Sequence, residues 1–572
     1  MSVRSLTAWC LAGFSAGILL MSCAGQVPPQ GGPPDTEPPR ILSVYPAPST
    51  LFFQDSRIVL EFDEHVDHQS VEGSIFVSPS LGPLEFDWSG NEVEISFIDS
   101  LRSNTTYVFS LGTDVVDLRN KNRMAEAFSL AFSTGDAIDP GAITGSVYPA
   151  SMTDQLSGIF VFAYNIDTVD PDTLNPSKSE PDYVTQTGKT GEFHLSHLAL
   201  GTYRLLAVRD EYKNLLYDPE TDEYGAAAGD VQLAANDTMR AGITMKLARE
   251  DTTAPRLVKV TPLNRGLLLA ELSEPIDTSS FGTRNVQVSD STGKNPVQVL
   301  SVSLLIPQRK EFFVATQEQK PGLLHELRIH DAKDLSGKDI SQSAFSIQFV
   351  SSDLPDTSSP AVASFSFADS TRGIELRPLT EIRFTEPVRR VDWRSMVDLR
   401  DSLDRSVHIE GGWANDAVIT ARPVSDLAGS AWYSLIVRTG SLQDWKGMTG
   451  RDTIRAMRFQ TLDSERLSTI AGLVNDPEKI DTIGRVVVTA WPVGKKDAVP
   501  RSVTIEGPGP FELAQLPEGQ YVMQVFRDRN GNKKFDAGRV FPYQMSERFS
   551  VAPDTLKLRA RWPLENVQLR LR

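Results

Sequence analysis

Oxygen-bearing side chains recur at alternate positions of one short segment near the carboxyl end of the chain. Asp528, Asn530, Asn532 and Asp536 occupy positions 1, 3, 5 and 9 of a segment that also contains a glycine. Calcium is a hard cation that takes roughly six to eight oxygen ligands, and curled loops supply them from alternate residues. The spacing predicts a weak Ca²⁺ site at these four residues, and a polar hairpin turn is the competing interpretation. Ca²⁺ is the one candidate cofactor, and the sequence requires none.

Aromatic side chains are concentrated in one stretch of the chain. Four of the eight tryptophans, Trp393, Trp413, Trp432 and Trp445, fall within residues 355–465. Exposed indole rings stack on sugar rings, so this stretch is the candidate ligand-binding region, with a glycan as the ligand. Packing in a sandwich core is the competing interpretation, because buried tryptophans are common in two-sheet folds.

A glutamate recurs at the end of three similar strands, at Glu64, Glu274 and Glu386. Glycoside hydrolysis needs two carboxyl groups that converge on one bond. Within each repeat the glutamate stands alone, so we expect a structural residue at a strand end, before a turn that Pro275 or Pro387 fixes. No Ser/His/Asp set can be assembled from the sequence, and we predict that the protein is not an enzyme.

Charge and cysteine content exclude several other classes. The formal charge of −17 argues against a nucleic-acid partner, because a phosphate backbone requires a basic surface. The two cysteines, Cys10 and Cys23, both lie at the amino end. The rest of the chain therefore holds no disulfide framework and no cysteine-based zinc site.

The amino-terminal residues indicate export. Arg4 precedes an apolar run from Leu6 to Met21, the layout of a secretory signal. The run ends in Leu20-Met-Ser-Cys23, which resembles the lipobox of bacterial lipoproteins. The resemblance implies a signal peptide at 1–22 and a lipid on Cys23, and Ala24 in place of aspartate implies the outer membrane. The proline-rich residues up to 38 are expected to form an extended tether.

A repeat organises the remaining chain. Three segments share, in one order, a proline-bearing start, a strand ending in glutamate, an aspartate-containing turn and a closing strand. This pattern resembles the SbsA-type bacterial Ig-like domain. Two other segments match each other, from Ile143-Thr-Gly and Ile470-Ala-Gly onwards, and resemble the Cna-B or carboxypeptidase-regulatory-like (prealbumin-like) sandwich. The predicted modules are 39–138, 139–250, 251–354, 355–465 and 466–572, of which the first, third and fourth are Ig-like.

Alternating side chains predict the fold class. Val93, Ile95 and Phe97 alternate with polar residues, and the same period of two recurs from Tyr107 to Leu111 and from Tyr521 to Val525. One buried and one wet face is typical of antiparallel sandwiches. We therefore predict an all-β chain, a tandem array of about five β-sandwiches.

These observations together favour an envelope protein without catalytic machinery. We expect an outer-membrane lipoprotein, on the periplasmic face or the cell surface, that acts as a structural spacer and as an adhesion-type interaction scaffold. Its expected partners are the membrane, through the lipid, and envelope proteins or glycans. The alternative is a glycan- or peptide-binding lipoprotein that is accessory to a transport or secretion complex.

Overall fold

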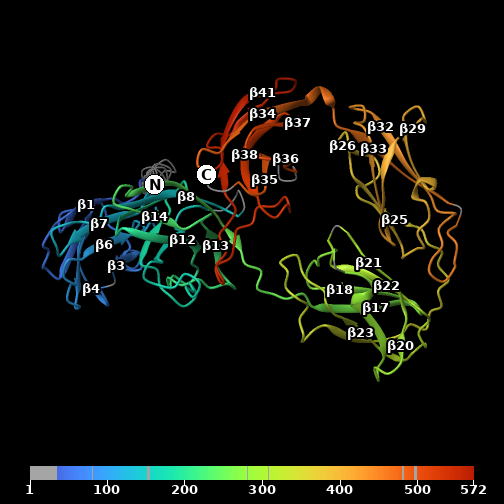
Figure 1. Cartoon of the computed structure of the whole chain (residues 1–572), viewed down its shortest axis with the longest axis horizontal. Helices are drawn as coiled ribbons and strands as arrows, with labels where there is room; N and C mark the ends of the chain where they lie inside the picture. The colour runs from blue at the N-terminus through green and yellow to red at the C-terminus, as the bar shows by residue number, and fades with distance from the viewer. Residues whose placement is uncertain are drawn as a thin grey trace, which may run out of the picture. The chain divides into compact units, whose positions relative to one another are not determined.

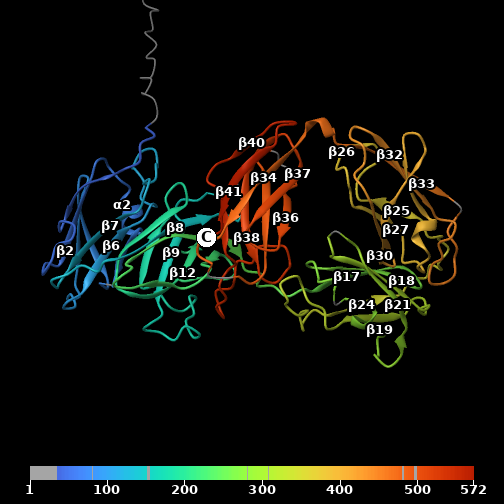
Figure 2. The same cartoon turned by 45° about the horizontal axis from the view of Figure 1, so that its top comes forward.

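The computed structural model describes residues 35–79, 81–150, 155–279, 281–306, 308–451, 453–479, 482–494 and 499–572. The predicted signal peptide, Cys23 and most of the tether lie outside these ranges, so the predictions made for them stay predictions. The described residues form strands, turns, three short 3-10 helices and a five-residue α-helix, α2 (Figure 2). The prediction of an all-β chain built from tandem sandwiches is confirmed.

The described chain divides into two compact units, and the division falls inside the second module. The first unit holds the residues up to Leu174 together with Ser179–Arg209 and Asp230–Ile243. The second unit holds Asn175–Lys178, Asp210–Gly229 and everything from Thr244 onwards.

The first module is a sandwich of a four-stranded and a three-stranded sheet (Figure 1, blue). The sheets have the orders β1-β2-β5-β4 and β3-β6-β7, and their apolar faces enclose one core that includes Leu60, Ile95 and Phe109. Its elements are β1 (Ile41–Tyr45), β2 (Arg57–Phe62), α2 (His68–Glu72), β3 (Ile75–Ser78), β4 (Leu84–Ser89), β5 (Glu92–Phe97), β6 (Thr106–Leu111) and β7 (Phe128–Ser133).

The second module has strands in both units. In the first unit, β11, β8 and the first part of β15 form one sheet and β10, β9 and β12 form another, with β14 paired to β12. In the second unit, β13 pairs with β16. The strands are β8 (Gly141–Tyr148), β9 (Phe160–Asn165), β10 (Tyr183–Gln186), β11 (Glu192–Leu198), β12 (Gly201–Arg209), β13 (Glu223–Ala226), β14 (Val231–Leu233), β15 (Met239–Lys246) and β16 (Ala248–Arg249).

The third module repeats the strand order of the first. Its sheets are β17-β18-β22-β21 and β20-β19-β23-β24, packed on a core that includes Leu268, Phe312 and Leu327. Its elements are β17 (Leu257–Asn264), β18 (Leu267–Leu272), η1 (Thr283–Asn285), β19 (Val286–Asp290), β20 (Pro296–Val297), β21 (Val299–Leu304), β22 (Glu311–Thr316), β23 (Leu324–Ile329) and β24 (Ser346–Val350).

The fourth module has the same first sheet, β25-β27-β31-β30, and a second sheet, β26-β33-β32-β28-β29. Ile382, Leu435 and Phe459 are part of its core. Its elements are β25 (Val362–Phe365), β26 (Thr371–Ile374), β27 (Thr380–Phe384), η2 (Trp393–Ser395), β28 (Val397–Asp401), β29 (Ser406–Val407), β30 (Ile409–Asn415), β31 (Val418–Pro423), β32 (Trp432–Arg438) and β33 (Ile454–Thr461).

The fifth module (Figure 1, red) pairs a β37-β34-β41 sheet, in which β34 and β41 are parallel, with a β36-β35-β38-β39 sheet. Its core includes Ile470, Val488 and Met523. Its elements are η3 (Ser464–Arg466), β34 (Leu467–Asn475), β35 (Arg485–Pro492), β36 (Arg501–Ile505), β37 (Pro510–Pro517), β38 (Gly519–Asp528), β39 (Phe549–Val551), β40 (Leu556–Leu558) and β41 (Leu564–Arg570).

In the described residues, no helix has both the length and the apolar character that crossing a membrane requires.

Candidate functional site

Three carboxylates converge at one end of the third module and again in the fourth. In the third-module triad (Asp251, Glu274 and Asp334), one oxygen from each side chain lies within 4.8 Å of the others. In the fourth-module triad (Asp356, Glu386 and Asp444), one oxygen from each side chain also lies within 4.8 Å of the others. Each triad thus gathers residues that are far apart in the sequence into one small acidic cluster.

The same three elements position each triad. The first aspartate lies in the segment that connects the module to the preceding one, and the glutamate follows the second strand of the module's first sheet, β18 or β27. The second aspartate lies in the turn after β23 or β32. Isolated bridges, Ile276 with Asp334 and Val388 with Asp444, hold that turn against the segment after the glutamate.

The turn aspartates are fixed by their own loops through one oxygen only. Oδ1 of Asp334 accepts the backbone N–H groups of Ser336 and Lys338, both at 2.8 Å. Oδ1 of Asp444 accepts those of residues 446 and 448, also at 2.8 Å. These bonds fix the loop through Oδ1 and leave Oδ2 of each aspartate outside this network of backbone hydrogen bonds.

The remaining oxygens are buried without partners. Asp334 and Asp444 are each 2% exposed, and Oδ2 of each has no hydrogen-bond partner among the described residues. A buried acceptor that is left unpaired costs about 1–3 kcal/mol, and more when it carries charge. Native proteins therefore rarely leave such an atom without a partner of some kind.

The electrostatics of the triads disfavour three bare negative charges. The pKa of Glu274 is raised, mainly by burial and to a smaller extent by the negative charges of Asp251 and Asp334. A hydrogen bond with Thr253 and the charge of Lys310 partly offset this increase. The pKa of Glu386 is raised to about 8, mainly by burial and to a smaller extent by the negative charges of Asp356 and Asp444. Like charges at close range and loss of water both favour the neutral carboxyl. Either a proton or a cation can relieve the excess charge.

Glu386 is the more buried of the two glutamates, at 4% exposure. Gly266 and Thr316 of the third module line the small space beside the fourth-module triad, together with Trp445 and Lys446. Neighbouring apolar residues of the two modules, including Phe313 and Val418, pack in one cluster. Packing between the two modules therefore removes water from this triad.

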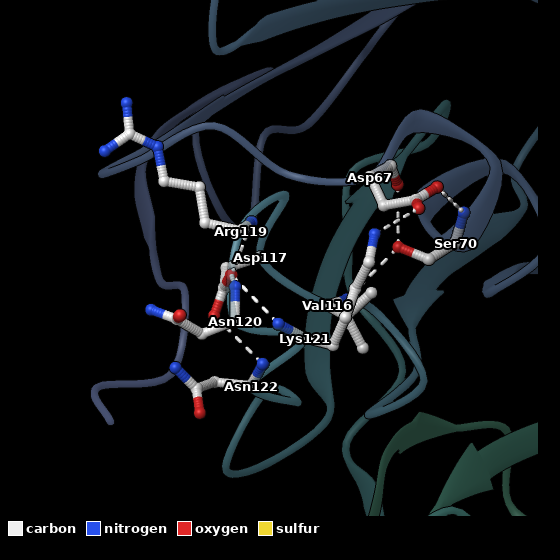
Figure 3. A network of polar contacts seen from close by, with 8 residues as sticks. All are labelled: Asp67, Ser70, Val116, Asp117, Arg119, Asn120, Lys121 and Asn122. Atoms are coloured by element: carbon white, nitrogen blue, oxygen red, sulfur yellow. Dashed lines mark hydrogen bonds and ion pairs between the residues drawn. The ribbon is translucent and has the colours of Figure 1, made fainter. Parts of the chain in front are cut away.

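The corresponding residues at the first module are Asp35, Glu64 and Asp117, but there the turn aspartate has no oxygen left unpaired. Burial, and then Asp117 and Asp35, raises the pKa of Glu64. Asp117, however, uses both oxygens within its own turn: Oδ1 accepts the N–H groups of Arg119, Asn120 and Lys121, and Oδ2 that of Asn122 at 2.9 Å (Figure 3). No buried acceptor of Asp117 is left unpaired.

The expectation that each recurring glutamate stands alone in its repeat is wrong for Glu274 and Glu386. The sequence shows the acids of each repeat, but it does not show that the aspartate turn folds back over the connecting segment. One feature of the sequence could have indicated the triads: an acidic residue occurs in the proline-bearing start, at the strand end and in the aspartate-containing turn of each repeat.

The predicted calcium loop is brought together by its own hydrogen bonds. Asp528 accepts the N–H groups of Gly531 and Asn532 on Oδ1 and that of Lys533 on Oδ2. The side-chain amides of Asn530 and Asn532 donate to Oδ2 of Asp536 at 2.7 and 3.2 Å. The loop thus satisfies its acceptors as a polar turn would, and its binding of Ca²⁺ stays a prediction.

The four tryptophans occupy separate environments. Trp393 is 6% exposed and part of the core, and Trp413 packs against that core and donates its N–H to the Val391 carbonyl at 2.8 Å. Trp432 is half-buried under the guanidinium groups of two arginines, and Trp445 lies under another. Their role as a glycan-binding set stays a prediction.

One segment of the chain, in the first module, matches a known protein family. Residues 35–134 match the family described as bacterial Ig-like domain. No curated protein matches the chain.

Solved structures similar to this chain share little sequence with it. The N-terminal part of the bacterial S-layer protein SbsC has 11% identity and a TM-score of 0.17, over 36% of this chain and 44% of that one. Domains 1–6 of SbsC have 9% identity and a TM-score of 0.17, over 92% and 68%. Native alpha-2-macroglobulin from Escherichia coli, spanning domains MG0-NIE-MG1, has 12% identity and a TM-score of 0.15, over 49% and 95%. The chain spans less than half of the first of these, and at such TM-scores none carries an argument about function.

Proposed function

We propose that this protein is a non-catalytic structural scaffold of the cell envelope, anchored in the outer membrane by a lipid on Cys23. The observation that carries the proposal is the tandem array itself, because the described chain is built of β-sandwiches and the first matches the bacterial Ig-like domain family. Repeated sandwiches joined by short segments provide reach and repeated surfaces. The SbsA-type and Cna-B-type resemblances of the modules support the same role.

The anchor supplies one end of this scaffold. Several acyl chains on one residue hold a protein firmly at a membrane, where a single chain is marginal. The proline-rich residues 24–38 then separate the lipid from the first sandwich. The sandwiches serve as spacers and as surfaces for envelope proteins or glycans.

Substitution of the two cysteines in a Gram-negative host tests the proposal. Cys23→Ser is expected to abolish incorporation of labelled fatty acid and to release the protein from the outer-membrane fraction. Cys10→Ser, the matched change inside the apolar run, is expected to preserve both. A wild-type chain without lipid, or a Cys23→Ser chain that still fractionates with the outer membrane, would contradict the anchor. Protease treatment of intact cells then separates a cell-surface scaffold from a periplasmic one.

A further inference from the structure

Two features of the acidic triads point to a missing positive partner. Oδ2 of Asp334 and Oδ2 of Asp444 are buried acceptors without a partner, and each belongs to a group of three converging carboxylates. The free oxygen is not a by-product of a loose loop, because the other oxygen of the same carboxylate accepts two backbone N–H groups at 2.8 Å. The turn holds the free oxygen in place.

No side chain in the described ranges neutralises these six carboxylates by an ion pair within 4.0 Å. Lys310 lies close enough to influence Glu274, and Lys446 does so for Glu386. Lys446 is 3.7 Å from Glu318, outside the triad. Each triad is therefore a buried or half-buried group of three carboxyl groups without an ion-pair partner among the described side chains, and buried charges in proteins are either paired or bound to a metal.

The dimensions of the triads match a shared cation. Two oxygens that bind one Ca²⁺ at about 2.4 Å are at most about 4.8 Å apart. The three oxygens of each triad lie within 4.8 Å of one another. We propose that the third-module triad and the fourth-module triad are two binding sites for a hard divalent cation, Ca²⁺ or Mg²⁺. Carboxylates supply the charged ligands, and backbone carbonyls and water complete the shell.

A cation at these positions has a mechanical consequence. Asp251 and Asp356 lie in the segments that connect successive modules, and the other four ligands belong to the module bodies. The bound cation ties each connecting segment to the module that follows it, so it restrains the joint. The first module provides an internal contrast, because Asp117 has already used both oxygens. The proposal concerns the chain in solution and does not depend on where the protein is anchored.

The test uses the full chain, treated with EDTA and desalted, and titrated calorimetrically with CaCl₂ and separately with MgCl₂. Glu274→Gln and Glu386→Gln are each expected to remove one site, or to raise its Kd at least tenfold, and the double variant to remove both. Glu311→Gln, an exposed glutamate of the third module, is the matched control and is expected to leave both sites intact. Asp251→Asn and Asp356→Asn alter the same two sites from the segments that precede β17 and β25, so they repeat the test on a second ligand of each site.

Hydrogen exchange provides the second readout. The cation is expected to slow exchange in residues 251–256 and 355–361 of the wild-type chain, and this protection is expected to disappear in the double variant. A melting temperature in EDTA that is no lower than that of the wild type shows that the variants fold. The proposal is overturned if neither cation binds at about 10 mM, or if the double variant binds as many cations as the wild type does. The second result would place the binding elsewhere, for example at the 528–536 loop.

Discussion

Asp476 is the centre of a buried ion cluster in the fifth module, and neutralising it is expected to weaken that module strongly. Its carboxylate accepts hydrogen bonds from Nη1 and Nη2 of Arg548 at 2.9 and 2.8 Å and from Nη2 of Arg527 at 3.1 Å. The three side chains are between 2% and 4% exposed. Asp476→Asn would therefore leave two buried guanidinium groups without their counter-ion.

The expected loss follows from that burial. Removing one partner of a buried ion pair costs about 3–5 kcal/mol, because the remaining charge is stranded in a medium of low polarity. The backbone N–H of Lys479 also donates to Oδ1 of Asp476, at 3.1 Å, so the change disturbs a further bond. We expect Asp476→Asn to lower the free energy of unfolding of the fifth module by at least about 3 kcal/mol.

The loss depends on pH in a definite direction. Burial by itself would raise the pKa of Asp476, but the hydrogen bonds and charge of Arg548, the Lys479 N–H and Arg527 hold it below the usual range. A lowered pKa in the folded state means that the ionised carboxylate contributes stability above its unfolded pKa of about 3.9, and that this contribution is lost as pH falls through the folded pKa. The wild type and Asp476→Asn should therefore converge in stability under strong acid.

Hydrogen exchange on the full chain measures this effect locally. A loss of about 3 kcal/mol corresponds to roughly 150-fold faster exchange of the most protected amides of β34, β38 and β41 at neutral pH. Amides of β6 in the first module serve as the internal reference. Glu506→Gln is the matched control, because its pair with Arg485 is 3.2 Å long but exposed, at 56% and 86%, and exposed pairs contribute at most about 1 kcal/mol. If Asp476→Asn and Glu506→Gln accelerated exchange equally, the reasoning about burial would be refuted.

Three further changes test other parts of the fold. Gly472→Ala places a Cβ 1.9 Å from the Val567 carbonyl oxygen and should cost at least about 1–3 kcal/mol of overpacking, whereas Gly507→Ala, with open space around it, should leave thermal unfolding unchanged. Trp393→Ala should cost about 3–5 kcal/mol in denaturant unfolding, because the ring lies in the core. Burial raises the pKa of Glu547 to about 7, so the stability that its neutral form provides is lost as pH rises from about 4 towards 7, and Glu547→Gln should flatten that slope in thermal melts.

The alternation of apolar and polar side chains correctly predicted which residues of a strand are buried where only one face of its sheet is covered by other elements. In β5, Val93, Ile95 and Phe97 are buried and the residues between them are not, as predicted. In β6, the residues that alternate with Tyr107, Phe109 and Leu111 are buried as well. β6 is the middle strand of its sheet, and within the first unit β10 and β11 lie against it, so its outer face is also covered. A pattern along one strand cannot show which neighbour covers its other face.

The structure, but not the sequence, explains why the second and fifth modules have a glycine at the same position. Gly145 and Gly472 occupy the same place in the Ile-x-Gly segments that match in sequence. A Cβ on Gly145 would lie 2.1 Å from the Ile243 carbonyl oxygen, and one on Gly472 would lie as close to Val567. Both glycines therefore permit a neighbouring strand to approach. The repeat could be predicted from sequence, and the close approach that requires glycine could not.

The acidic triads show the same limit at the site. Each repeat displays its three acids as separate landmarks, and spacing along the chain gives no distance between them. Their convergence depends on two bridges, at Ile276 and Val388, that belong to the tertiary structure. The 528–536 loop shows the reverse case, in which a local spacing typical of calcium ligands gives acceptors already filled by the loop's own N–H groups.

The effect of neutralising a buried carboxylate on stability should depend on divalent cations at the fourth-module triad, and it should not depend on them at Asp476. Asp476 is balanced by arginines, so Asp476→Asn should destabilise the chain equally in EDTA and in Ca²⁺. Glu386 has no such partner and lies beside two aspartates, so Glu386→Gln should leave the melting temperature unchanged or raised in EDTA. In Ca²⁺ the same variant should lose the part of the wild-type increase that the fourth-module site provides, because a ligand that binds only the folded chain stabilises it. Equal destabilisation of Glu386→Gln with and without Ca²⁺ would mean that the triad is a structural cluster that needs no cation.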